Sequence, residues 1–111
     1  MLFSQHRRIG NIVLLSGQVG IKDGKLIEGG LEEETREALR NVSRELNHVG
    51  LTMDNVIDVT VFLTDLPRDY APMNKIYETC FGDPKPTRTC FGVASLPLGA
   101  KIEFKVIAEH K

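Results

Sequence analysis

The chain has 111 residues, of which 41% are hydrophobic and 26% are charged. This length and composition are typical of one globular domain and exclude a multidomain or disordered chain, so we expect residues 1–111 to form a single domain. Fourteen Lys and Arg residues against fifteen Asp and Glu residues leave a net charge of −1. No overall electrostatic field therefore favours nucleic acid or an anionic membrane as a partner.

The first strand is predicted at residues 11–15. This β-rich apolar run ends at Ser16-Gly17, which is typical of a buried strand followed by a turn. A further turn is expected at residues 22–25, where an Asp-Gly pair adopts positive φ at little cost. The basic cluster His6-Arg7-Arg8 is too short for a nucleic-acid-binding arm, and we interpret it as the solvated face of an edge strand or turn.

Residues 31–49 predict the strongest helix of the chain. Apolar side chains recur there at steps of three and four and form one stripe, while the run Glu32-Glu33-Glu34 places negative charge near the positive end of the helix. Gly50 is expected to end the helix in a left-handed cap, which lets Leu51 fold back on Leu46.

A half-buried strand is predicted at residues 55–64, where apolar and polar side chains alternate. Its buried face carries four aliphatic residues, which are Ile57, Val59, Val61 and Leu63. Pro67 then opens a second helix, which is expected to end at Gly82. The apolar stripe of this helix consists of Tyr70, Met73, Tyr77 and Phe81.

Two closing strands are predicted at residues 88–94 and 101–108. The order of strand, helix, strand, helix, strand and strand predicts an α+β fold in which two helices pack on one face of a mixed, mainly antiparallel sheet. The other face of the sheet is partly apolar through Phe62 and Ile107. An apolar patch of this kind usually becomes a subunit interface.

The two cysteines, Cys80 and Cys90, form no CxxC pair and have no nearby histidine cluster. This pattern argues against a zinc site and favours two free thiols in a reducing compartment. No apolar run approaches the roughly 18 residues of a membrane span, and the amino terminus does not have the pattern of a secretory signal. We therefore expect a cytoplasmic protein.

Arg88, Glu103 and Ser16 are the candidate residues for chemistry. The Arg88 guanidinium could bind a substrate carboxylate through two hydrogen bonds, and Glu103 could orient or deprotonate a water molecule. Ser16, with Gly17 beside it, could bring a hydroxyl to a pocket. From spacing alone, the simpler interpretations are a solvated arginine at a strand end, ordinary strand alternation and a plain turn.

Several separated motifs strengthen the functional interpretation when they are taken together. They are SGQV at 16–19, TVFLTDL at 60–66, MN at 73–74, RTC at 88–90, LP at 96–97 and KIE at 101–103. In this order they resemble the RidA family of reactive-intermediate deaminases, also called the YjgF or L-PSP family. The resemblance runs from about residue 9 to residue 109.

The resemblance implies a chorismate-mutase-like α+β fold and a homotrimer with ligand clefts between neighbouring subunits. It implies an enzyme of the 2-iminobutanoate/2-iminopropanoate deaminase type, a hydrolase acting on C–N bonds. Such an enzyme converts enamines and imines, above all 2-aminoacrylate, to 2-oxo acids and ammonia. The ligand is then a small 2-imino or 2-oxo acid, and neither a metal nor an organic cofactor is expected.

The resemblance also implies roles for individual residues. Arg88 matches the substrate-binding arginine of the family, and Glu103 matches its water-orienting glutamate. The other ligand-contacting positions are Ser16, Gly17, Asn74 and Cys90. Cys90 lies two residues beyond Arg88 and therefore on the same face of the strand.

The chain departs from the family pattern at Phe3, which stands where the family has a pocket tyrosine and which keeps the ring without the hydroxyl. This departure leaves open a second hypothesis, a regulatory trimer that binds small carboxylates without turning them over. A third hypothesis is the RNA-cleaving activity ascribed to some members of the family. The near-zero charge and the lack of a histidine pair argue against it.

Overall fold

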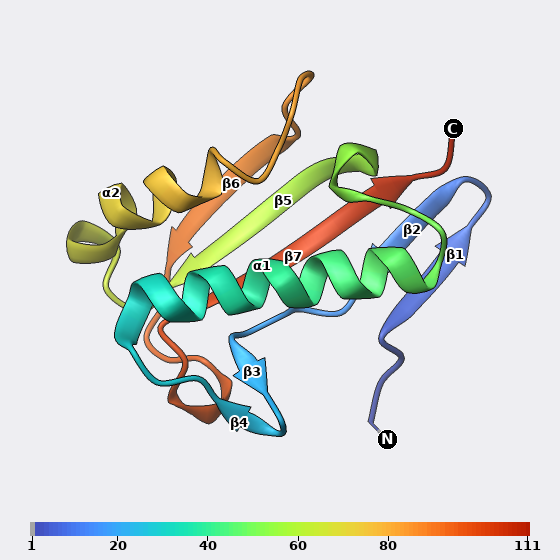
Figure 1. The fold of residues 1–111 in the computed structure, drawn as a ribbon. Coiled ribbons are helices and arrows are strands. Elements are labelled where there is room, and N and C mark those ends of the chain that lie inside the picture. The colour runs from blue at the N-terminus through green and yellow to red at the C-terminus, as the bar shows by residue number, and fades with distance from the viewer. Residues whose placement is uncertain (1) are drawn as a thin grey trace.

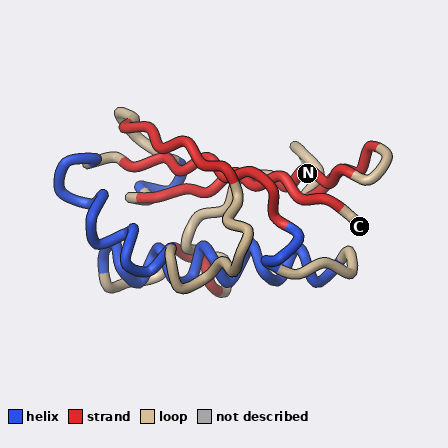
Figure 2. The backbone as a smooth tube through the Cα atoms, turned by 90° about the horizontal axis from the view of Figure 1, so that it is seen from above, coloured by secondary structure: helices blue, strands red, loops and turns tan. Residues whose placement is uncertain are grey.

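Within residues 2–111, the part of the chain that the computed structural model describes, a five-stranded sheet forms one layer and two α-helices form the other. The sheet order is β1-β2-β7-β5-β6. These strands are β1 (His6–Ile9), β2 (Ile12–Leu15), β5 (Val56–Leu63), β6 (Thr87–Gly92) and β7 (Ile102–Glu109). Helices α1 (Gly30–His48) and α2 (Leu66–Tyr77) lie on the same side of the sheet (Figure 1, Figure 2).

The pairing of the strands confirms the predicted α+β fold. Neighbouring strands of this sheet are antiparallel except for β5 and β6, which run parallel and are connected through α2, as a parallel crossover requires. A separate hairpin joins β3 (Ile21–Lys22) to β4 (Lys25–Leu26). The hairpin turns at the predicted Asp-Gly pair, where φ is 54° at Asp23 and 79° at Gly24.

Helix α1 has the predicted bounds to within one residue and ends in the predicted cap. Gly50 has a φ of 77°, a conformation that glycine adopts without steric cost. The Leu51 N–H donates to the Leu46 carbonyl at 2.9 Å, and both side chains are buried in the core. The chain therefore turns sharply into η1 (Met53–Asn55), a short 3-10 turn that leads into β5.

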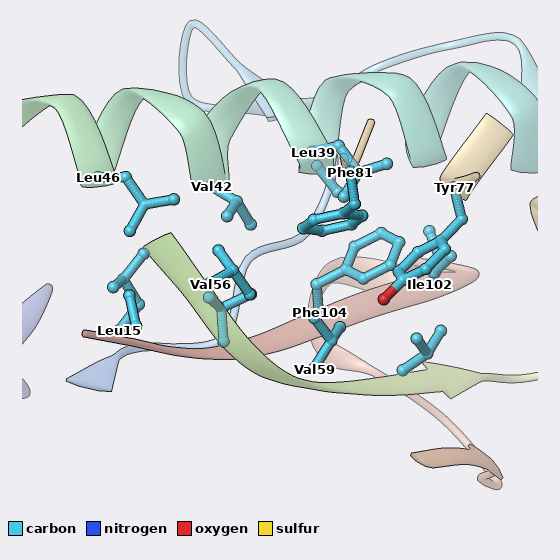
Figure 3. Close-up of a cluster of buried hydrophobic side chains, with 14 of the residues drawn as sticks. Leu15, Leu39, Val42, Leu46, Val56, Val59, Tyr77, Phe81, Ile102 and Phe104 are labelled. Carbon is cyan, nitrogen blue, oxygen red and sulfur yellow. The ribbon is translucent and has the colours of Figure 1, made fainter. Parts of the chain in front are cut away.

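The core lies between α1, α2 and the sheet face that these helices cover (Figure 3). Most of it is aliphatic, since aromatic residues make up only 6% of the chain. Its aromatic centre is Phe104 of β7, whose ring stacks on that of Tyr77 from α2 with 6.4 Å between the centroids. Phe81, beyond the end of α2, packs against Tyr77 with 4.7 Å between the two ring centroids. This cluster fixes α2 over β7 and β5.

One predicted core residue lies on the wrong side of the sheet. Ile57 is 40% exposed, while Val56 beside it is buried. The cause is a register shift in which two steps along β5, from Val56 to Asp58, oppose one step along β7, from Ala108 to Ile107. The extra residue is a β-bulge, and it interrupts the alternation that the sequence suggests.

The second helix also differs from its prediction. Helix α2 ends at Tyr77 rather than at Gly82, and a turn closed by the Cys80 N–H and the Tyr77 carbonyl follows at once. Tyr70, predicted as part of the buried stripe, is 42% exposed. Its side chain points past the core toward the edge strand β6, where it contacts Arg88.

The basic cluster His6-Arg7-Arg8 lies on β1, an exposed edge strand, as predicted. The sheet face turned away from the helices carries apolar side chains that α1 and α2 do not cover. On this face the rings of Phe62 and Phe91 stack at 6.2 Å, and Phe91 is 51% exposed.

Candidate functional site

The predicted site residues fall into two groups on opposite faces of the sheet. On β6, Arg88 and Cys90 pair in register with Val59 and Val61, two core residues of β5 that face the helices. On β7, Glu103 pairs with Phe62, on the face turned away from the helices. Within one chain, Arg88 and Glu103 therefore do not meet. We call the two groups the arginine half-site and the glutamate half-site.

In the arginine half-site, side chains of α2 hold the Arg88 guanidinium. Arg88 Nη1 donates to Asn74 Oδ1 at 2.7 Å, and Nη2 donates to the Tyr70 hydroxyl at 3.1 Å. The guanidinium carbon also lies 4.8 Å from the centre of the Tyr77 ring, a cation–π contact. Tyr70 and Asn74 are four residues apart, so one face of α2 presents both groups to β6.

A guanidinium has five N–H donors, and Asn74 and Tyr70 engage one from each terminal nitrogen. Nη1 also donates weakly to Met73 Sδ at 4.0 Å. Among the described residues, the donors that remain for an anion are therefore the Nε–H and the second N–H of Nη2. An open cleft of about 480 Å³ adjoins the guanidinium and is lined by Leu66, Pro67, Tyr70, Arg88 and Cys90. Its apolar walls and single strong cation suit a small carboxylate.

Cys90 lines the same cleft, on the strand face that the sequence predicts. Burial raises the pKa of its thiol, and the neighbouring Arg88 offsets only part of this effect. The thiol therefore stays protonated at neutral pH. It is a wall of the cleft rather than a thiolate nucleophile.

The glutamate half-site is built around a bulge that directly follows β2. Four steps along the chain from Leu14 to Gln18 oppose three steps along β7 from Ile107 to Phe104. The extra residue lifts Ser16 and Gly17 out of the regular ladder, and Gln18 then pairs with Phe104 through hydrogen bonds of 2.8 and 2.9 Å. The bulge brings the Ser16-Gly17 backbone against Glu103.

Gly17 allows the closest approach in this half-site. A Cβ atom placed on it would lie 2.9 Å from Glu103 Cδ, which no side chain tolerates without moving the carboxylate. Ser16 Oγ donates to the Ser4 carbonyl at 2.5 Å, which ties the amino-terminal segment to the bulge. Burial raises the pKa of the Glu103 carboxyl, and the nearby Lys105 lowers it by a smaller amount.

A second cleft, of about 420 Å³, opens beside Glu103. Its polar end is formed by Ser16, Gly17 and Glu103. The rest is apolar and is lined by Phe3, Val19, Ile21, Pro97 and Leu98. Pro97 and Leu98 come from η2 (Pro97–Gly99), the 3-10 turn that leads into β7.

The structure thus brings Asn74 and Cys90 to Arg88, and it brings Ser16, Gly17 and Phe3 to Glu103. Sequence reasoning missed the role of Tyr70, because its helical spacing indicated a core residue. The signal that was present is its position four residues before Asn74, which places the two side chains on one face of α2.

The fold and the two half-sites define a class of protein, namely small α+β proteins whose polar site is divided into two parts. One part holds a guanidinium that can bind an anion, and the other holds a half-buried carboxylate. The family model described as Endoribonuclease L-PSP matches residues 1–110. The chain belongs to this L-PSP family, the one that its motifs resemble.

Individual relatives agree with this membership. The chain is 37% identical over 108 residues to a mouse protein named 2-iminobutanoate/2-iminopropanoate deaminase, covering 96% of this chain and 79% of the mouse protein. The crystal structure of yeast Mmf1 superposes with a TM-score of 0.94 at 37% identity, covering 99% of this chain and 88% of that one. The crystal structure of E. coli TdcF with bound serine superposes with a TM-score of 0.89 at 32% identity, covering 98% of this chain and 88% of that one.

Some relatives are named as mitochondrial proteins and others have names that state no compartment. The MMF1 protein of Saccharomyces cerevisiae is one of those named as mitochondrial, so the cytoplasmic location stays a prediction for this chain. In residues 2–111, no helix has the length and apolar character needed to cross a membrane.

Proposed function

We propose that this protein hydrolyses small 2-imino acids, including the imine form of 2-aminoacrylate, to 2-oxo acids and ammonia. The observation that carries the proposal is the held guanidinium of Arg88, which keeps free donors beside an open cleft. The names of the mouse and rat relatives support the reaction class. Neither a metal nor an organic cofactor is part of the proposal.

Arg88 binds the substrate carboxylate in this mechanism. Two parallel N–H bonds to the carboxylate oxygens fix the plane of the substrate and the position of its C2 atom. Asn74 and Tyr70 already restrain the guanidinium, so little side-chain freedom is lost when the ligand binds. Hydrogen bonds to charged groups contribute roughly 1.5–3 kcal/mol each in a partly dry site.

Glu103 acts on the water. Its carboxylate accepts a proton from a water molecule while the water oxygen attacks C2 of the protonated imine, which gives a carbinolamine. The same proton then passes to the amino group. The C–N bond breaks as Glu103 takes the proton of the new hydroxyl group, which leaves the 2-oxo acid and ammonia, and this proton then passes to the ammonia to give ammonium. A carboxyl group whose pKa is raised by burial suits both the acceptance and the return of the proton.

The two half-sites complete one another in a homotrimer under this proposal. Arg88 and Glu103 lie on opposite sheet faces of one chain, so a site that uses both needs a second copy. The uncovered apolar side chains on the outer sheet face, including Phe62 and Phe91, are suited to an interface. Light scattering should give about three times the 12.4 kDa of one chain, and the mass of one chain would contradict the trimer.

Coupled turnover tests the proposed reaction. A serine dehydratase generates 2-aminoacrylate in place, and the rate of pyruvate release is followed with and without this protein. Wild type should accelerate the release, and Arg88→Ala should be no faster than buffer. Arg36→Ala is the matched control, because Arg36 is a surface residue of α1 paired with Glu33. The reaction is wrongly assigned if wild type itself does not exceed buffer.

A second function is favoured by one observation. The arginine half-site is complete within a single chain, while the glutamate half-site has Phe3 without a hydroxyl. A carboxylate sensor would need only the former. Calorimetric titration with 2-oxobutanoate separates the two functions: binding that disappears in Arg88→Ala, together with no deamination, favours the sensor.

A further inference from the structure

We propose that the Tyr70 hydroxyl is a specificity-determining contact that donates a hydrogen bond to the carboxylate of the ligand bound by Arg88. The inference rests on the proposed function and assigns a recognition role to a residue outside the motifs that indicated the site. The ligand class is an α-oxo or α-imino acid with a free, ionised carboxylate.

The position of Tyr70 supports a contact with the ligand. Its hydroxyl lies 3.1 Å from Arg88 Nη2, and its ring lies 5.6 Å from the guanidinium carbon. The residue is 42% exposed and lines the cleft of about 480 Å³ that contains the guanidinium. An anion that binds the free donors of Arg88 therefore lies beside this hydroxyl.

The chemistry of the hydroxyl gives the direction of its bonds. A phenol has one O–H donor and lone pairs that accept. Arg88 carries no acceptor, so the Tyr70 oxygen must accept from Nη2, and its own proton remains available. Polarisation by the cation strengthens that donor, and a carboxylate held by the guanidinium is a charged acceptor within reach.

Tyr77 provides an internal comparison. Its ring also contacts the Arg88 guanidinium, at 4.8 Å, but its hydroxyl is buried and has no hydrogen-bond partner within residues 2–111. Tyr77 does not line the cleft, whereas Tyr70 does. The two tyrosines thus share the contact with the cation and differ in access to the ligand.

The glutamate half-site makes the role of Tyr70 more significant. The aromatic residue that lines the cleft beside Glu103 is Phe3, which carries no hydroxyl. Among the residues that line the two clefts, Tyr70 is the one phenol. A ligand that spans both half-sites can receive a phenolic hydrogen bond only from the arginine side.

Calorimetric titration of the full-length protein with 2-oxobutanoate and with its neutral amide, 2-oxobutanamide, tests the inference. Tyr70→Phe keeps the ring and the cation–π contact and removes only the hydroxyl. We expect about five- to tenfold weaker binding of the acid, since a partly exposed hydrogen bond to a charged group is lost. Binding of the amide should change less than about twofold, because it offers no ionised acceptor.

Two further measurements accompany the titration. Thermal unfolding verifies that Tyr70→Phe folds like wild type, and the same pair of titrations on Tyr77→Phe gives the matched comparison. The loss of selectivity for the acid should be at least about 2.5-fold larger in Tyr70→Phe than in Tyr77→Phe. In turnover assays, Tyr70→Phe should raise KM for the imine with little change in kcat.

The possible outcomes separate this inference from the proposed function. Equal affinity of wild type and Tyr70→Phe for 2-oxobutanoate would overturn the role of Tyr70 and leave the deaminase proposal standing. Equal losses on the acid and the amide would also overturn it, because they indicate a displaced ring rather than a lost carboxylate bond. No binding of 2-oxobutanoate by wild type would overturn this inference, while pyruvate release in the coupled assay decides the deaminase proposal separately.

Discussion

The two half-sites are positioned by different parts of the protein. In the arginine half-site, side chains of α2 hold the functional group, with Asn74 and Tyr70 bonded to the Arg88 guanidinium. In the glutamate half-site, the backbone positions the Glu103 carboxylate, through the bulge at Ser16-Gly17 and the close approach of Gly17 to Glu103. The comparison teaches that the two half-sites depend on separate elements of the fold, so under the proposed function anion binding and water activation should respond separately to substitution.

Glu103→Gln is expected to give the largest difference between the effect on turnover and the effect on ligand affinity. The variant removes the base but leaves the arginine half-site untouched, since the two lie on opposite sheet faces. Loss of a general acid–base group lowers kcat by roughly 10²- to 10⁴-fold, whereas affinity for 2-oxobutanoate should stay within about twofold. Turnover and titration are measured on the same preparation. An equal loss of affinity would show that the two half-sites are not independent.

Gly17→Ala should cause the next largest loss of turnover. Its Cβ would lie 2.9 Å from Glu103 Cδ, so the carboxylate must move while the backbone, which is not left-handed at this residue, stays unstrained. A displacement of this size costs roughly ten- to hundredfold in turnover. Gly82→Ala is the control, because its Cβ would meet only Asp54 Oδ1 at 3.3 Å. Full activity of Gly17→Ala would mean that the position of Glu103 is not critical.

The pH dependence of kcat is expected to report the glutamate half-site alone. Glu103 must be ionised to accept the proton of the water, and burial raises its pKa above the usual 4.5. Activity should therefore be full above this raised pKa and fall about tenfold for each pH unit below it. An acidic limb at or below 4.5 would contradict the assignment.

The smallest effect is expected from Tyr77→Phe, which keeps the ring beside the Arg88 guanidinium and removes only the hydroxyl. The Tyr77 hydroxyl is buried without a partner, and burial raises its pKa to about 12. Removal of an unpaired buried donor should leave the free energy of unfolding unchanged or raise it by about 1 kcal/mol. Denaturant unfolding measures the change. A clear loss of stability would reveal a bonded hydroxyl.

Local patterns predicted most of the fold. The apolar stripe of α1 and the Gly50 cap were readable because each depends on residues close in sequence. The exposure of Ile57 was not, because the bulge that causes it appears only when β5 pairs with β7. The parallel pairing of β5 and β6 is likewise a property of the assembled sheet.

For the candidate site, the sequence predicted the residues but not their arrangement in space. The motifs identified Arg88 and Glu103, but alternation within a strand says only which residues share a face of that strand. It does not say that β6 and β7 present these residues to opposite faces of one sheet. Apolar spacing along α2 assigned Tyr70 to the core, whereas its 42% exposure and its contact with Arg88 appear only when β6 lies beside the helix.

Subunit complementation tests the central claim most directly, namely that one site takes Arg88 from one copy and Glu103 from another. Arg88→Ala and Glu103→Gln chains are unfolded, mixed in equal amounts and refolded together, and pyruvate release is measured. Random assembly of a cyclic trimer restores about a quarter of the sites, so about a quarter of wild-type turnover should return. A mixture no more active than the average of the two variants refolded separately would contradict the account.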